Sequence, residues 1–267
     1  MRRVTDLRTI IRTVVVAAAL AGAALALPSP AQAAKPNWRV TIHANHTTVK
    51  AGNKVWFHGK VAKSAAGKLV TLQERLSGST WKTQRNALVH RDGTYTTYDA
   101  PRVNRRHAYR VVMPASKNHQ RGVSAKAVVD VYKWTPLTTI PSVNAESLYA
   151  VTSVAFNGMA FPSSLEAWMY DGSPTTQSIE FNLDHACTRF RGTFGISDDS
   201  ESGSQASVRA SADGTSWYDH TFAVGQSQPN SFTFATPPLK VRFDTTSLVA
   251  GFDGLGAVGT PQVYCEE

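Results

Sequence analysis

Two aromatic side chains and a carboxylate, Trp168, Tyr170 and Asp171, lie close together in a segment whose composition is typical of a loop. A tryptophan or tyrosine ring can stack against the apolar face of a pyranose, and a planar carboxylate can accept hydrogen bonds from its hydroxyl groups. These three residues are therefore candidate ligands for carbohydrate. The alternative is that Trp168 is packed inside the fold, because tryptophan is highly buried on average.

A second acidic group follows at Asp198, Asp199 and Glu201. Asp198 and Asp199 are further candidates for bonding sugar hydroxyls. Together with Glu201 they offer the hard oxygen ligands that Ca²⁺ prefers, although their spacing differs from that of an EF-hand loop. The remaining alternative is a solvated turn. We expect no cofactor, with a structural calcium ion as the one option left open.

Catalytic motifs are missing from the sequence. It has no G-x-S-x-G elbow, no HExxH and no glycine-rich phosphate loop. Paired carboxylates could form a glycosidase site, but a chain of this length offers such pairs by chance. We therefore expect a protein that binds its ligand without catalysing a reaction.

The two cysteines, Cys187 and Cys265, are the only ones in the chain. In an oxidising compartment an isolated pair most simply forms one disulfide. The N-terminus points to such a compartment, because four arginines are followed by the uncharged run Val14–Leu27 and by Ala31-Gln32-Ala33. This order is that of a signal peptide over residues 1–33, too short in its apolar part for a typical membrane span. An uncleaved anchor helix is the alternative. We expect secretion, with association to the cell wall as an option, and no membrane span after cleavage.

Charge divides the remaining chain into two parts. Residues 34–134 hold 19 Lys and Arg against four acids, whereas residues 135–267 hold five against 14. Such a change of sign indicates two domains with separate surfaces. Residues 135–141, with two prolines and three threonines, are expected to be a short linker, which leaves a basic domain at 34–134 and an acidic one at 142–267.

The basic domain shows the alternation of short β-strands, at residues 39–43, 54–61, 69–73, 109–113 and 127–132. Short strands at this spacing predict an antiparallel Greek-key sandwich. The stretch from VKAGNKVWFHGKV to GVSAKAVVDVY resembles the immunoglobulin-like modules of secreted actinobacterial proteins, over roughly residues 36–132. The resemblance implies a spacer or adhesion unit without a catalytic site.

Six basic residues gather in one stretch of this domain: Arg102, Arg105, Arg106, Arg110, Lys117 and Arg121, with His107 and His119 among them. They could contact an anionic polymer of the cell envelope. A specific nucleic-acid site is not expected, because aromatic residues do not interleave with these charges in the sequence. The alternative is a solvated basic surface that keeps the domain soluble.

The acidic domain also alternates, at residues 178–183, 188–196, 205–210, 231–234 and 239–243. In the second of these strands Phe190 and Phe194 are expected on one face and Arg189 and Arg191 on the other. Asp213-Gly214 is a hairpin signal. Residues 142–167 are less regular and favour a short helix or loop around 145–148.

The order SIEFNLDHACTRFRGTFGISDD, ASVRASADGTSWY, PPLKVRFD and DGLGAVGTPQVYC resembles the NPCBM-type carbohydrate-binding modules, over roughly residues 169–265. The resemblance implies a galactose-binding-like jelly roll and a carbohydrate or envelope polysaccharide as partner. A histidine common in that family before the first of these strands is absent here, so the sugar is not implied. The sequence thus predicts an all-β protein of two β-sandwich domains that binds glycan, or alternatively a structural or adhesion protein that binds another protein.

Overall fold

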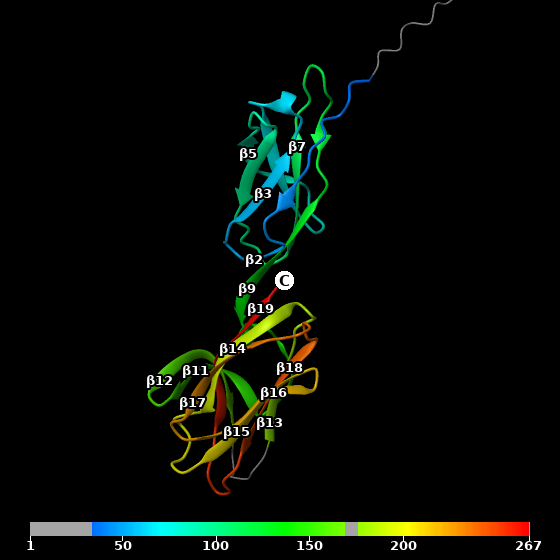
Figure 1. Ribbon diagram of the computed structural model, residues 1–267. Coiled ribbons are helices and arrows are strands. Elements are labelled where there is room, and N and C mark those ends of the chain that lie inside the picture. The colour runs from blue at the N-terminus through cyan, green and yellow to red at the C-terminus, as the bar shows by residue number, and fades with distance from the viewer. Residues whose placement is uncertain (1–33, 169–175, 267) are drawn as a thin grey trace, which may run out of the picture. The chain divides into compact units, whose positions relative to one another are not determined.

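The computed structural model describes residues 34–168 and 176–266, and these are built almost entirely of β-strands (Figure 1). The all-β prediction is confirmed, and the strands form two sandwiches, each around its own cluster of buried residues. Within the described residues, no helix is sufficiently long and apolar to cross a membrane. The predicted signal peptide, residues 1–33, lies outside the described residues.

The first module is a sandwich of two sheets. One sheet has the order β1-β3-β6, and its strands are His43–Ala44, Val55–Lys60 and Thr94–Asp99. The other has the order β2-β9-β7-β4-β5, with strands Thr48–Lys50, Ala127–Pro136, Arg106–Met113, Leu69–Leu76 and Lys82–Leu88. The short strand β8 (Gly122–Val123) pairs with β7. β2 runs parallel to β9, whereas the remaining pairs in this module are antiparallel.

Alternation of side chains fills the core of this module. In β3, Val55 and Phe57 are buried while Trp56 and His58 point to solvent, as a period of two requires. Tyr109 of β7 is completely buried and its hydroxyl donates a hydrogen bond to Asp99 Oδ2 (2.8 Å). This bond joins the end of β6 to β7 across the sandwich.

The second module packs a five-stranded antiparallel sheet against five strands of an 11-stranded sheet, which continues through the β19–β9 pair into the first module. The first sheet has the order β10-β13-β18-β15-β16, with strands Ser142–Glu146, Thr176–Asn182, Lys240–Ser247, Gln205–Ala212 and Thr215–Ala223. The five strands of the second sheet have the order β11-β12-β19-β14-β17 and comprise Leu148–Phe156, Met159–Ala167, Gly256–Cys265, Cys187–Ile196 and Ser227–Thr233. Phenylalanines from both sheets, Phe181, Phe190, Phe194 and Phe243, meet in the core between them.

Three local predictions for this module are confirmed. Phe190 and Phe194 are buried whereas Arg189 and Arg191 are exposed. Asp213 and Gly214, with φ of 47° and 81°, form the β15–β16 hairpin, because both central residues of such a turn need positive φ. Cys187 and Cys265 face each other across β14 and β19 and form the predicted disulfide.

The segment 135–141, expected to be a linker, is part of the folded structure. Thr135 and Pro136 end β9, whose last residues pair with β19. A 3₁₀ turn follows at Leu137–Thr139, and the Leu137 side chain is fully buried in the core of the second module. Leu137 therefore anchors this segment by apolar burial.

Two segment predictions are wrong. Residues 39–42 are not a strand, since β1 comprises only His43 and Ala44. Residues 142–167 hold no helix, because they form β10, β11 and β12. Their pattern is hard to see in the sequence because buried and exposed side chains do not alternate regularly along them, and β10 is exposed throughout.

Candidate functional site

The candidate binding site is one end of the second module, called here the loop end. It consists of Trp168 and the loops 197–204 and 248–255. Strand register brings them together, because Glu166 near the end of β12 pairs with Ala257 near the start of β19, and Ile196 at the end of β14 pairs with Gly256. Trp168 follows β12, the loop 197–204 connects β14 to β15, and the loop 248–255 connects β18 to β19.

Trp168 lies directly after β12, and 55% of its surface is exposed. Its backbone N–H donates to the carbonyl of Ser147 (2.7 Å), which fixes the position of the main chain. The alternative that Trp168 is packed inside the fold is therefore excluded. Tyr170 and Asp171 lie outside the described residues.

The two loops are fastened to each other by hydrogen bonds. The amide of Leu255 donates to Ser200 Oγ (2.9 Å), and the amide of Ser197 donates to the carbonyl of Leu255 (2.8 Å). The amide of Glu201 donates to the carbonyl of Asp253, and the amide of Asp253 donates to the carboxylate of Glu201. These bonds hold the loops in place, so that groups they carry are pre-organised.

Asp198 is occupied by the backbone of another turn. Its two carboxylate oxygens accept the N–H groups of Asn157 and Gly158 (2.6 and 2.7 Å). These bonds satisfy the turn between β11 and β12, so Asp198 has a structural role in this state. The amide of Asp199 contacts Ser197 Oγ at 3.4 Å.

The expected calcium site is not formed. In residues 34–168 and 176–266, no three His, Cys, Asp or Glu side chains form a group that could hold a metal ion. Asp198, Asp199 and Glu201 are adjacent in sequence, but Asp198 turns towards the β11–β12 turn and Glu201 towards Asp253. The sequence could not show this, because both partners lie more than 40 residues away.

Sequence reasoning missed four residues at the loop end. Leu248 and Phe252 expose 46% and 40% of their surfaces beside the acidic loop. The sequence signal that could have revealed Phe252 is an aromatic residue inside the glycine-rich stretch AGFDGLG.

Glu166 Oε1 and Asp253 Oδ1 are buried and have no hydrogen-bond partner among the described residues. Burial raises the pKa of Glu166, and the negative charge of Asp199 raises it further. A hydrogen bond from Ser197 acts in the opposite direction and lowers this pKa.

Trp217 is a packing residue at the rim of the core. Its ring lies 4.9 Å from that of Phe190 and stacks on Phe232 at 5.0 Å. A hollow of about 390 Å³ beside it is lined by Trp217, Phe232, Phe234 and the β15–β16 turn. The ring contacts assign Trp217 to the packing of the core.

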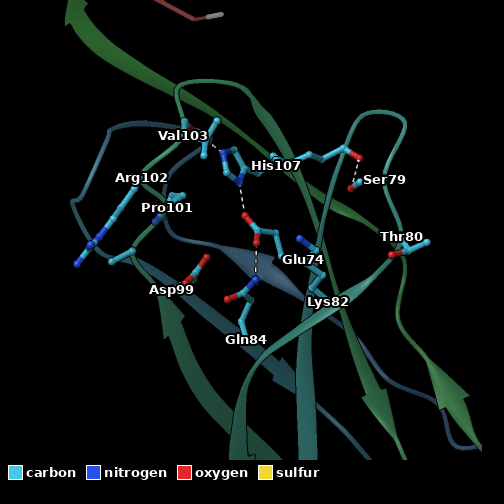
Figure 2. Close-up of a pocket in the computed structure, with 12 residues that line it drawn as sticks. Glu74, Ser79, Thr80, Lys82, Gln84, Asp99, Pro101, Arg102, Val103 and His107 are labelled. Atoms are coloured by element: carbon cyan, nitrogen blue, oxygen red, sulfur yellow. Dashed lines mark hydrogen bonds and ion pairs between the residues drawn. The ribbon is translucent and has the colours of Figure 1, made fainter.

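A polar cavity of about 350 Å³ lies in the first module, between β4, β5 and β7 and the segment after β6 (Figure 2). His107 is buried at its wall, with Nδ1 on Glu74 and Nε2 at 2.8 Å from the carbonyl of Val103. The second oxygen of Glu74 accepts a bond from Gln84. These groups bond to one another across three strands, so the cavity wall is a structural network.

Burial alone would lower the pKa of His107. The bonds to Glu74 and Val103, together with the charges of Glu74 and Asp99, outweigh burial and raise the pKa. The imidazole is thus favoured in its charged form, donating from both nitrogens to oxygen acceptors.

Three of the six basic residues that are adjacent in sequence have different surroundings in the structure. Arg106 pairs with Asp130 (2.7 Å), Arg110 lies over the ring of Trp81 (4.1 Å), and Arg102 lines the polar cavity. His119 stacks on Trp38 and His107 is buried. Three of the six basic residues are thus engaged by different partners, whereas Arg121 lies close enough to Arg110 for their charges to repel.

No family model matches the sequence, and no curated protein matches it. Among solved structures, the chain is similar to CBM51 from Clostridium perfringens GH95 in complex with methyl-galactose, with a TM-score of 0.37 and 11% identity over 49% of this chain and 99% of that one. It is also similar to TmCBM61 in complex with beta-1,4-galactotriose, with a TM-score of 0.27 and 10% identity over 51% and 88% of the two chains. A carbohydrate-binding module of the β-sandwich superfamily has a TM-score of 0.28 and 8% identity, over 87% of this chain and all of that one. At TM-scores this low the likenesses do not identify the chain's function.

Proposed function

We propose that this protein is a secreted, non-catalytic glycan-binding protein whose second module binds carbohydrate at the loop end. The observation that carries the proposal is the exposed indole of Trp168 beside loops that hydrogen bonds hold in place. An aromatic side chain that is about half exposed (55%) on a fixed backbone offers a stacking surface for a pyranose at little entropic cost.

Two features support the wider proposal. The order of strands and motifs in residues 169–265 resembles the NPCBM-type modules, whose jelly roll binds sugar. The Cys187–Cys265 disulfide fits an oxidising compartment, in agreement with the signal-like residues 1–33. The carboxylate of Asp198, bonded to two amides, is held as a structural group, so it does not act as a catalytic acid in this proposal.

The first test is a glycan array probed with the chain from Ala34 onward, followed by titration of the sugar that binds. We expect Trp168→Ala to weaken binding by roughly tenfold or more, because an aromatic contact contributes about 0.5–1.5 kcal/mol beyond the apolar area that it buries. Phe252→Ala should weaken the same binding to a smaller extent. The control is Trp81→Ala, which removes a partly exposed tryptophan from the first module, outside both the loop end and the sheet that carries Trp56.

Saturable binding that Trp168→Ala and Trp81→Ala leave equally strong would overturn the proposed site. A blank array together with a defined protein partner would instead support an adhesion protein. Thermal unfolding of each variant confirms that the fold is intact.

A further inference from the structure

The outward side of the β1-β3-β6 sheet brings together cations and aromatic rings that are scattered in the sequence. Successive outward residues of β3 are Trp56, His58 and Lys60, and they pair with Tyr98, Thr96 and Thr94 of β6. Lys54 precedes β3, and Arg85 reaches the same region from β5. We call this set of side chains the cationic–aromatic face.

Tyr98 is the centre of this face. The guanidinium of Arg85 lies 4.0 Å from its ring centroid, and Lys54 Nζ lies 4.8 Å from it. The ring of Trp56 approaches Tyr98 with centroids 4.9 Å apart and a tilt of 51°. Both cations are therefore held in place by the ring, while Trp56 keeps 38% of its surface exposed.

Carboxylates balance only a small part of the charge of this face. Three of the four acids of residues 34–134 are engaged elsewhere: Glu74 by His107 and Gln84, Asp99 by Tyr109 and Asp130 by Arg106. Asp92 lies at one end of the face, where it accepts hydrogen bonds from Thr94. Against these acids stand 19 Lys and Arg in the same residues, and a surface with such an excess of one sign attracts a partner of the opposite sign.

The face is also hollowed and elongated. A depression of about 320 Å³ is lined by Thr41, His43, His58, Lys60, Thr94 and Thr96. Along β3 the outward side chains from Lys54 to Lys60 extend over roughly 20 Å, at about 3.3 Å per residue. Such a strip suits a chain of several units better than a single small molecule.

We infer that the cationic–aromatic face binds an acidic polysaccharide, a chain of sugar rings that carry carboxylates. Trp56 offers the apolar stacking surface for a ring, Lys54, Arg85 and Lys60 meet the carboxylates, and the threonine hydroxyls and histidines meet the sugar hydroxyls. A single-stranded nucleic acid needs successive open rings for its bases. Tyr98 is covered by two cations and by Trp56, so the polysaccharide is the better match. This site is independent of the loop end of the second module.

The test uses polygalacturonate and its methyl-esterified form, which share a backbone and differ in charge. Binding of the chain from Ala34 onward is measured by titration at low and at moderate ionic strength. We expect binding to polygalacturonate, at least about tenfold weaker binding to the ester, and a clear loss on adding salt, because exposed charges are screened. Trp56→Ala should weaken binding roughly tenfold and Trp56→Tyr much less.

The double variant Lys54→Ala/Arg85→Ala should weaken binding at least as strongly as Trp56→Ala. Its matched control is Lys117→Ala/Arg121→Ala, which removes the same charge from the basic stretch outside this face. An equal loss in the control would overturn the location, because it would show an effect of net charge alone. Tighter binding of single-stranded poly-dT than of polygalacturonate would overturn the choice of partner. Trp168→Ala should leave this binding unchanged, so the two proposed sites can fail separately.

Discussion

At the scale of single residues, position in the sequence was a poor guide to which charged side chains bond to other groups of the protein. Glu74 and His107 lie 33 residues apart and nothing in their sequence neighbourhoods connects them, yet they form a buried pair. Asp198 was a candidate ligand and is instead bonded to a turn. By contrast, Trp168 is exposed, as a ligand-binding aromatic residue must be. Exposure of an aromatic beside a loop follows from local composition, whereas long-range pairing of charges does not.

The His107–Glu74 pair predicts a dependence of stability on pH. Because the pKa of His107 is raised by folding, its stabilising contribution is complete below about pH 6.5, the ordinary histidine value, and is lost as pH rises through the higher folded value. Thermal unfolding between mildly acidic and mildly alkaline pH should show the first module losing stability over this window. Glu74→Gln should remove most of that dependence.

Glu74→Gln should also cost about 3 kcal/mol at mildly acidic pH, because it leaves a buried imidazolium without its carboxylate. Denaturant titration of the variant measures this free energy of unfolding. An unchanged pH dependence in the variant would contradict the assignment to this pair.

At the scale of elements, strands with regular alternation were predictable and strands with interruptions were not. The stretch from Thr188 to Ile196 was predicted as a strand and is one, since its phenylalanines alternate with arginines. Strands β10 to β12 were missed because buried and exposed side chains do not alternate regularly along them. Strand β5 was missed because nearly all of its residues are exposed, which leaves no apolar pattern to detect. The loop end could be located only from the pairing between strands, and the sequence of a single strand does not show with which residues it pairs.

Strands β3 and β6 approach each other closely at Gly59. A Cβ atom added at this position would overlap the hydroxyl of Tyr95 and the carbonyl of Thr41, which are bonded to each other. Gly59→Ala should therefore destabilise the first module by about 2–3 kcal/mol, as overpacking does. Denaturant unfolding measures this, and Gly78→Ala, at an exposed turn with open space but a φ of 70°, shows the cost of backbone strain without overlap. An unaffected midpoint in Gly59→Ala would show that β3 can shift away from Tyr95.

At the scale of the whole molecule, the described residues form two large clusters of buried residues, one in each module. The two parts of the chain also differ in the sign of their net charge, which is positive for residues 34–134 and negative for residues 135–267. The disulfide belongs to only one of these cores, because Cys187 and Cys265 close β14 onto β19 across 78 residues. Local stability should therefore respond unequally when it is removed.

Replacing both cysteines by serine should cost the second module about 2–5 kcal/mol, mainly through the larger freedom of its unfolded chain. Hydrogen exchange followed by mass spectrometry should show lost protection in β13 to β19 and unchanged protection in β3, β4 and β7. The control is wild type with and without reductant, which should reproduce the difference. Equal loss in both sets of strands would mean that the two cores unfold as one unit.

The position of β5 at the end of its sheet has a consequence for self-association. An outermost strand leaves backbone donors and acceptors unpaired, and a second molecule can add to it as a template for aggregation. Lys82 and Arg85 place positive charge along this strand and oppose such addition between identical chains. Leu88, exposed and paired with Leu69, leaves one end of the strand without that protection. Removal of Arg85 would thus bring β5 closer to pairing with its own copies at high concentration.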